Sequence, residues 1–379
     1  MIETGSNTGN AIWQDLADAA ESGACVVVIR NTVGLAQETY RQLKSHCRDR
    51  GILFGLLHSR FPQFKRDEIE GVWMERLGKN DQARPPGCIL VATQVIEQSV
   101  DIDADLLVTD LAPVDLILQR LGRLHRHRRP RPVGFENPRC VILMPEVNWQ
   151  ADEMAIKTAL GPSAFVYPPF SLFQAERVIS GLADRAIKLP EDIRPLVEEA
   201  CRVPCDLESG ASFFRDDLQR ETDEMVNTSK QLDVFHSPTE NDKEGAKTRW
   251  NDTPTALLVL LRRAPHAAST HIEFLNGERV PFHYGPFNYL LALALHRNAV
   301  RVPRYLVRHA MAQQPPWLGT NIHDAVLGVV HDNATCELVG FDRTPPYLLV
   351  YRDDTGLSHT RHAAAFFTPT LDPSDDSWF

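Results

Sequence analysis

The chain has 379 residues, of which 43% are apolar and 24% charged, and its 40 basic and 50 acidic side chains give a formal net charge of −10. These values are typical of a soluble globular protein with two or three domains. No apolar run approaches the roughly 18 residues that a membrane-spanning helix needs, and the polar start MIETGSNTGN lacks the basic and apolar regions of a signal peptide. We therefore expect a cytoplasmic protein that does not act at a membrane.

The first third of the chain, about 1–149, alternates between strand-like and helix-like segments. Continuous apolar runs such as ACVVVIR are typical of strands that are buried on both faces of a parallel sheet. The segment NAIWQDLADAAESG instead places apolar residues at helical spacing and closes with Gly23. The alternation predicts an α/β domain with a parallel sheet. We expect strands over 24–30, 52–59, 88–93, 104–112 and 139–145, and helices over 10–23, 32–51, 64–79 and 113–124.

The remaining sequence divides into two further regions. Residues 150–245 read as mainly helical and acidic, since 151–245 hold 10 basic and 19 acidic side chains, with a loop expected at 236–247. From 246 to 379 strand-like and helix-like segments are mixed, which predicts a small α+β accessory domain after the helical linker region. There we expect strands over 253–263, 271–282 and 345–357, and helices over 285–300 and 301–313.

Positive charge is concentrated in QRLGRLHRH, residues 119–127, although the chain as a whole is acidic. Gln119 and Arg123 lie one turn apart on the expected helix, and Arg126 follows three residues later. Guanidinium groups can bind phosphate oxygens with two hydrogen bonds, and at a γ-phosphate they stabilise the charge that develops during phosphoryl transfer. A glycine at 122 allows close approach of the backbone. The alternative interpretation is a solvated basic helix face.

A basic tail, Arg128, Arg129 and Arg131, follows this stretch. For the tail, a solvated surface and binding of a phosphate backbone are equally good interpretations.

Upstream of the basic stretch, ILVATQVIEQSVDIDADLLVTDLAP (89–113) contains two buried strands that end in polar side chains. Open α/β sheets bind ligands at the carboxyl ends of their strands. The order of elements is that of motifs V and VI in the second RecA-like lobe of superfamily-two helicases. The segments VATQVIEQSVDID, LVTDLAPVDLILQRLGRLHRH, VIRNTVGLAQETY and LLHSRF closely resemble the CRISPR-associated helicase–nuclease of type I systems. The resemblance is strong over 25–144 and weaker in TRWNDTPTALLVLL and LLVYRDDTGL.

The resemblance implies a RecA-like lobe and a role for each matching residue. Arg123 and Arg126 would be arginine fingers that act on ATP bound with Mg²⁺. The nucleotide would also lie near Gln119, Gly122 and Asp101. Single-stranded DNA would run past the strand ends at Asn31, Thr32, Ser59, Arg60, Thr93 and Gln94. One departure from the broad superfamily is Ser99, where many helicases have glycine.

The sequence contains no G-x-x-x-x-G-K-[ST] phosphate loop, no D-E-x-H motif and no HD nuclease signature. The resemblance therefore implies the C-terminal half of the enzyme. Its partners would be an N-terminal helicase–nuclease half, on another chain or missing, which would hold most of the ATP and Mg²⁺, and an RNA-guided surveillance complex. We expect part of an ATP-dependent single-stranded DNA translocase that is inactive alone. The alternative is a non-catalytic DNA-binding or docking fragment of the same system.

The sequence predicts no metal site of its own. The CRVPC segment at 201–205 lacks a second pair of zinc ligands at the usual spacing, so we expect reduced thiols. The pairs His323-Asp324 and His331-Asp332 lack further ligands and are expected to lie in surface turns.

Overall fold

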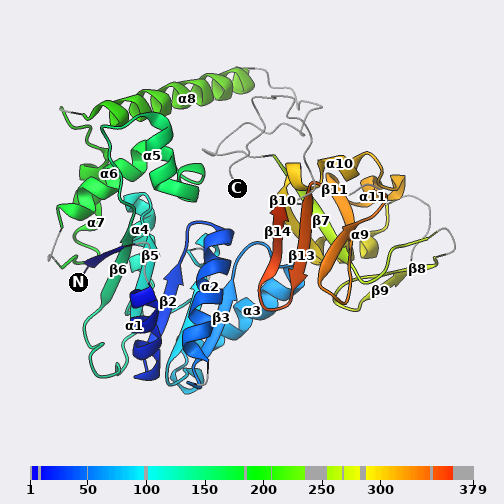
Figure 1. Cartoon of the computed structure of the whole chain (residues 1–379), viewed down its shortest axis with the longest axis horizontal. Helices are drawn as coiled ribbons and strands as arrows, with labels where there is room; N and C mark the ends of the chain where they lie inside the picture. Colours follow the sequence, from blue (N-terminus) through cyan, green and yellow to red (C-terminus); the bar gives the residue numbers. More distant parts are fainter. Residues whose placement is uncertain are drawn as a thin grey trace. The chain divides into compact units, whose positions relative to one another are not determined.

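The computed structural model describes residues 2–6, 10–48, 50–97, 101–182, 186–205, 207–234, 254–266, 269–281, 287–341 and 345–361 (Figure 1). The chain forms two compact units. The first comprises Met1–Phe54 and Glu75–Asp252, and the second comprises Gly55–Met74 and Thr253–Phe379. A segment from the first third of the sequence thus belongs to the same unit as the C-terminal region.

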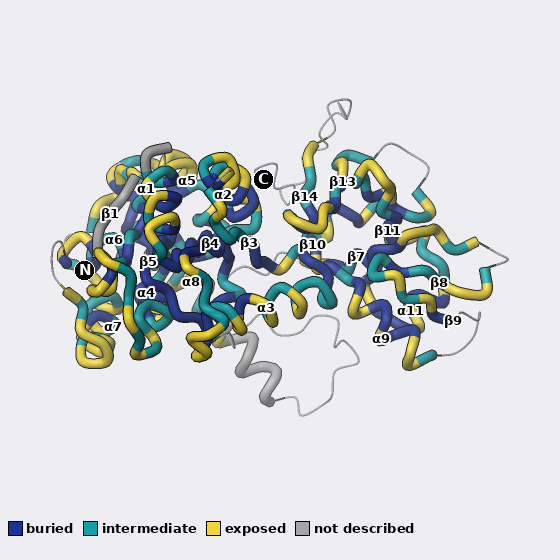
Figure 2. Tube along the Cα trace, turned by 90° about the horizontal axis from the view of Figure 1, so that it is seen from below, coloured by how far each residue is buried: buried dark blue, intermediate teal, exposed yellow. Residues whose placement is uncertain are grey.

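A six-stranded sheet organises the N-terminal region. Its order is β1-β6-β5-β2-β4-β3, and the neighbouring pairs from β1 to β4 are parallel. Every residue of β2, β4 and β5 is buried, which explains their uninterrupted apolar sequences, and Figure 2 shows dark, buried tube at β4 and β5. The strands are β1 (Ile2–Ser6), β2 (Cys25–Ile29), β3 (Leu53–Leu57), β4 (Cys88–Ala92), β5 (Leu106–Asp110) and β6 (Arg139–Met144). The parallel α/β prediction is confirmed, although the polar strand β1 was not predicted.

Helices connect these strands as the alternation predicted. Helices α1 and α2 pack against each other and against β4. Thr32 caps α2, since its hydroxyl accepts a hydrogen bond from the Leu35 backbone N–H at 3.2 Å. The elements are α1 (Asn10–Glu21), α2 (Val33–Cys47), α3 (Gln63–Leu77), the 3₁₀ turns η1 (Asp81–Ala83) and η2 (Gln94–Ile96), and α4 (Val114–Leu121).

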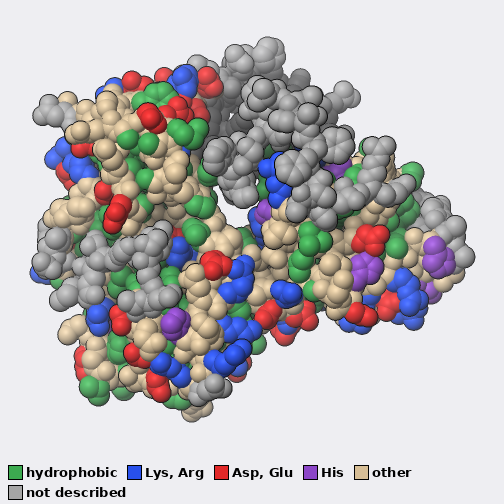
Figure 3. Space-filling model, in the orientation of Figure 1, with side chains coloured by type: hydrophobic (Ala, Val, Ile, Leu, Met, Phe, Trp, Pro, Cys, Tyr) green, Lys and Arg blue, Asp and Glu red, His purple; other side chains and the backbone are tan. Residues whose placement is uncertain are grey.

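The acidic region after the sheet is helical where it is described. Helix α6 contacts α4, α7 and α8, so this region packs on the sheet's own helices within the first unit. Figure 1 shows α8 running along α5 and α6, and Figure 3 shows acidic side chains along α8. The elements are α5 (Glu153–Leu160), η3 (Gly161–Phe165), α6 (Pro169–Ser180), α7 (Ile193–Cys201) and α8 (Ser209–Val234). The loop expected at 236–247 lies outside the described residues.

The second unit contains a mixed sheet of order β10-β7-β11-β12-β13-β14, in which only the β7–β11 pair is parallel among these described strands. A separate hairpin pairs β8 with β9. The elements are β7 (Thr255–Leu261), β8 (His271–Glu273), β9 (Arg279–Pro281), α9 (Tyr289–Arg297), β10 (Ala299–Pro303), η4 (Arg304–Leu306), α10 (Arg308–Met311), α11 (Pro316–Asn321), β11 (Ala325–Val330), β12 (Thr335–Leu338), β13 (Tyr347–Arg352) and β14 (Gly356–Arg361). The α+β prediction is confirmed.

The two helices predicted over 285–300 and 301–313 are wrong in part. The helix ends at Arg297, and Ala299–Pro303 form a strand that pairs antiparallel with β7. Alternate residues Val300 and Val302 are fully buried, so the segment has the two-residue period of a strand. Among the described helices, none combines the length and apolar character needed to cross a bilayer.

Candidate functional site

The segment after α4 is fixed by backbone hydrogen bonds to the residues before β5. The Ala104 N–H donates to the Arg123 carbonyl at 2.8 Å, and the His125 N–H donates to the Ala104 carbonyl at 3.0 Å. His125 adopts a φ of +50°, a left-handed conformation that is strained for a residue other than glycine. This turn brings the next two residues, Arg126 and His127, to Asp101.

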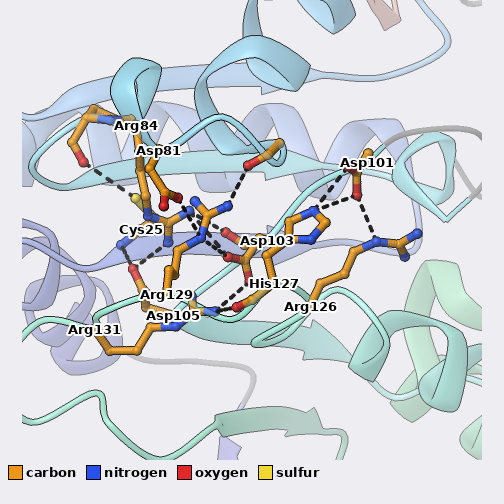
Figure 4. Close-up of polar contacts among 12 residues, drawn as sticks. Cys25, Asp81, Arg84, Asp101, Asp103, Asp105, Arg126, His127, Arg129 and Arg131 are labelled. Atoms are coloured by element: carbon orange, nitrogen blue, oxygen red, sulfur yellow. Dashed lines mark hydrogen bonds and ion pairs between the residues drawn. The ribbon is translucent and has the colours of Figure 1, made fainter.

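Asp101 holds both of these side chains. Its Oδ1 lies 2.8 Å from Arg126 Nε and 3.0 Å from His127 Nε2 (Figure 4). The Arg126 side chain remains 41% exposed, and in Figure 4 it extends away from the neighbouring cluster of Asp103 and Asp105. Its guanidinium is therefore positioned but accessible to a ligand.

Arg123 lies close to the same site. Its Nη2 donates to the Glu97 carbonyl at 2.6 Å. Burial, and next the positive charge of Arg126, lower the pKa of the Arg123 guanidinium. The two cations thus repel each other in this arrangement, and an anion bound between them would relieve that repulsion. Arg123, Arg126 and Asp101, which the sequence assigned to the nucleotide, are brought together.

The other two residues assigned to the nucleotide lie at the end of α4. Gln119 is exposed, and Gly122 forms the C-cap of the helix with an ordinary φ of −63°. A Cβ on Gly122 would lie 3.2 Å from the Gln119 carbonyl oxygen, so a larger residue would crowd the end of the helix.

The strand ends assigned to DNA contain residues of different accessibility. Asn31 is 1% exposed, and its amide donates to the Leu111 carbonyl at 2.7 Å and to Ser163 Oγ at 3.0 Å. Thr93, at the end of β4, is also buried, whereas Gln94 is half-buried. Asn31 thus holds the turn after β2 in place, and a direct contact of its side chain with DNA would require breaking these bonds.

Ser59 and Arg60 belong to the second unit. Ser59 is exposed, whereas Arg60 Nη1 lies 3.3 Å from His359 Nδ1 on β14. Burial, and next the charge of Arg60, lower the pKa of His359 to about 4, so the imidazole is neutral and Nδ1 can accept the hydrogen bond. The Arg60 carbonyl accepts from the Leu357 N–H at 2.9 Å.

The sequence interpretation missed Arg120, which is the largest fully buried side chain among the described residues. Its Nε forms an ion pair with Glu97 Oε1 at 2.7 Å, and its Nη1 donates to Asn31 Oδ1 at 3.2 Å and to Thr109 Oγ1 at 2.7 Å. Its Nη2 donates to the Tyr167 hydroxyl at 3.1 Å. The sequence did contain an indication that Arg120 is buried, because on a helix it shares one face with the apolar residues at 117 and 121.

A second buried cluster contains most of the basic tail. Arg131 pairs with Asp103 at 3.0 Å and with Asp105 at 2.8 Å, Arg129 pairs with Asp103 at 2.9 Å, and Arg84 pairs with Asp105 at 2.8 Å (Figure 4). The solvated-surface and phosphate-binding interpretations of the tail are therefore both wrong for Arg129 and Arg131. Both side chains are buried against the two carboxylates, while Arg128 is exposed.

The cluster predicts a specific dependence of stability on pH. Burial opposes ionisation of Asp105, but the hydrogen bond from the Cys25 N–H and the Arg131 and Arg84 guanidiniums outweigh it and lower the pKa of Asp105 below the ordinary 3.8. Its stabilising contribution is therefore complete above 3.8 and is lost as the pH falls through the lower folded-state pKa. In Asp105→Asn the free energy of unfolding should therefore depend less on pH below about 5, as measured by urea unfolding at a series of pH values. If the free energy of unfolding of the variant fell at low pH as steeply as that of the wild type, this assignment would be contradicted.

Within the described parts of the chain, no group of three or more His, Cys, Asp or Glu side chains is arranged to hold a metal ion. The pairs His323-Asp324 and His331-Asp332 are exposed at the two ends of β11, and Cys201 and Cys205 are exposed.

Comparisons with known proteins agree with this geometry. Residues 22–129 match the family model of the CRISPR-associated nuclease/helicase Cas3, C-terminal. The chain is 35% identical over 297 residues to the CRISPR-associated endonuclease/helicase Cas3 of Thermus thermophilus, which covers 70% of this chain. The chain matches the C-terminal, helicase-like region of CRISPR-associated nuclease/helicases. It spans 30% of the length of the Thermus relative.

Solved structures with this Cas3 fold extend the match to both units. One crystal structure of a CRISPR-associated protein aligns with a TM-score of 0.72 and 25% identity, and covers 95% of this chain and 41% of that chain. Another match, with a TM-score of 0.65 and 23% identity over 94% of this chain and 44% of that chain, comes from a structure described as a CRISPR RNA-guided surveillance complex, pre-nicking. The RecA-like fold and the resemblance to Cas3 C-terminal regions are thereby confirmed.

Proposed function

We propose that this chain supplies the second helicase lobe of an ATP-dependent single-stranded DNA translocase of CRISPR interference. Its task would be to complete an ATPase whose phosphate loop and magnesium-binding carboxylates lie outside this sequence. The observation that carries the proposal is the arrangement of Arg123 and Arg126, two neighbouring cations held by Glu97 and Asp101 with one guanidinium accessible.

The residues present fit a nucleotide phosphate. A guanidinium pair can bind phosphate oxygens, and its charge stabilises the transition state of phosphoryl transfer more than the ground state. The bound Mg²⁺ would neutralise phosphate charge from the other lobe. In this chain Arg126 would bind the γ-phosphate, Arg123 would hold the developing charge, and Asp101 would orient Arg126 between turnovers.

DNA would lie along the strand ends of the RecA-like sheet. The exposed or half-buried side chains there can contact a phosphate backbone without reading its sequence. Asn31 and Thr93 would act by holding the backbone of these turns, because both are buried. The acidic helices α5 to α8 are not expected to contact DNA, since their carboxylates repel phosphate.

The direct test is ATP turnover by this chain mixed with a chain that carries the phosphate loop and the acidic magnesium motif. We expect no turnover by this chain alone and DNA-stimulated turnover by the mixture. Turnover by the purified chain alone, or none in a mixture that forms a stable complex, would contradict the proposal.

The different exposure of Arg128 and Arg129 in the basic tail gives a specific prediction for DNA binding. Arg128→Ala should weaken binding of single-stranded DNA and reduce the slope of log affinity against log salt by about 0.7, the value for one phosphate contact on a single strand. Arg129→Ala should leave that slope unchanged and instead lower the free energy of unfolding, because it leaves Asp103 buried with one partner fewer. Fluorescence anisotropy across a salt series, with urea unfolding, separates the two outcomes; equal slopes for both variants would contradict the assignment.

We also propose a recruitment partner. The similar chain in the pre-nicking structure suggests that this region works beside an RNA-guided surveillance complex. The second candidate function, a non-catalytic docking or DNA-binding fragment, is favoured if the mixture binds DNA but does not hydrolyse ATP.

A further inference from the structure

The half-buried Gln94 after β4 and the arginine segment after α4 are joined by a continuous chain of hydrogen bonds. Gln94 Nε2 donates to the Asn31 carbonyl at 2.5 Å and to the Tyr167 hydroxyl at 3.2 Å. Both N–H groups of this amide therefore have acceptors inside the protein. A DNA phosphate that binds the Gln94 amide must replace one of them.

The chain continues through Arg120. Its Nη2 donates to the same Tyr167 hydroxyl at 3.1 Å, and its Nε pairs with the Glu97 carboxylate at 2.7 Å. The backbone carbonyl of Glu97 in turn accepts from Arg123 Nη2 at 2.6 Å. Hydrogen bonds, together with the covalent structure of Glu97, therefore connect Gln94 to Arg123 without interruption.

Burial makes this path stiff. Arg120 is completely buried, and Tyr167 and Glu97 are each 9% exposed. A buried polar group that loses one partner is costly to leave unpaired, so the loss favours a shift of the groups that remain. Tyr167 itself comes from the turn between η3 and α6, outside the sheet and outside the stretches that resemble helicase motifs.

We propose that Tyr167 and Arg120 are positioning residues that couple binding of DNA at Gln94 to the placement of Arg123. When a phosphate takes the Gln94 amide, the Tyr167 hydroxyl loses one donor and is held by Arg120 alone. The Arg120 guanidinium then shifts relative to the Glu97 carboxylate. Because the Glu97 carbonyl binds Arg123, this shift changes the position of the Arg123 guanidinium. The inference rests on the proposed function, because it requires that DNA bind at the strand ends.

The test is amide hydrogen exchange of the full chain with and without oligothymidylate. In the wild type, DNA should slow exchange at Gln94–Glu97 and also at Arg120–His127. Tyr167→Phe removes only the hydroxyl, and it should keep the slowing at Gln94–Glu97 but lose the slowing at Arg120–His127. Tyr289→Phe, an exposed tyrosine in the second unit, is the matched control and should behave as the wild type.

The outcomes separate the two proposals. If DNA slows exchange at both segments in Tyr167→Phe, the coupling is overturned while the proposed function stands. If Tyr167→Phe speeds exchange at Arg120–His127 equally with and without DNA, and the DNA-dependent change survives, the hydroxyl is only structural and the coupling is again overturned. If DNA protects neither segment in the wild type, the proposed function and the coupling fail together.

A second readout uses the mixture with the phosphate-loop chain. Tyr167→Phe should lower the ratio of DNA-stimulated to basal ATP turnover toward one, with basal turnover retained. An unchanged ratio would overturn the coupling.

Discussion

ATP turnover by the mixed assembly should fall by about 10³-fold or more when Arg126 is replaced by alanine, because arginine fingers contribute on the order of 10³–10⁵ in rate. The structure gives a reason for the size of the effect. Asp101 fixes the side chain through Nε and leaves the guanidinium accessible, so its alignment costs little when the nucleotide binds. DNA affinity should change little, since the charge acts mainly on the transition state. The measurement is steady-state turnover and DNA anisotropy on the same preparations.

Two further arginines serve as references for this experiment. Arg194→Ala, on the exposed face of α7, should leave both quantities unchanged. Arg60→Ala should weaken DNA binding and slow turnover only at low DNA concentration. If Arg126→Ala and Arg60→Ala both affect DNA affinity alone, Arg126 is a DNA contact and the ATPase proposal is wrong.

Replacing Arg120 with methionine should lower the free energy of unfolding by about 3–5 kcal/mol, the usual effect of removing one partner of a buried ion pair. Methionine keeps the unbranched shape, but the Glu97 carboxylate then remains buried without its cation. The acceptors on Asn31 and Thr109 lose the Arg120 donor as well, and the Tyr167 hydroxyl keeps only the donor from Gln94. Urea unfolding of this chain alone measures the effect, and no partner is needed.

The double variant distinguishes an uncompensated charge from a loss of packing. Adding Glu97→Gln to Arg120→Met removes the stranded charge, so part of the lost stability should return. Arg194→Met on the surface should change stability by less than about 0.5 kcal/mol. A loss below about 1 kcal/mol for Arg120→Met, or a further loss in the double variant, would contradict the role given to the pair.

The sequence was sufficient for the elements whose pattern is local. The buried strands of the parallel sheet are continuous apolar runs, and the helix before Gly122 has helical spacing and Pro113 at its start. The expected helix was too long, because it was predicted to reach residue 124 with Arg123 on its face, whereas α4 ends at Leu121 and Arg123 lies beyond it. Strand β1 was missed because it is polar, and it forms by pairing with β6, which lies far along the sequence.

The partners of buried charges could not be predicted in this way. Arg129 and Arg131 look like surface residues in a basic tail, and only the fold brings them to Asp103 and Asp105. Arg120 likewise needs acceptors from several separate segments, and Tyr167 among them lies 47 positions away. Charge in a sequence shows that partners are required but does not identify them.

The membership of Gly55–Met74 in the second unit has a consequence for biosynthesis. His58 Nε2 lies 3.1 Å from the Thr355 carbonyl, and a Cβ on Gly356 would come within 2.8 Å of the Arg60 carbonyl, so the β13–β14 turn fits directly against 58–60. As the ribosome makes the chain from its N-terminus, this segment emerges long before its partner strands. His58 and Thr355 are 297 positions apart, so nearly 300 further residues must be made before this contact can form. Contacts between residues so far apart in the sequence slow folding, because the long intervening chain must be ordered before they can form.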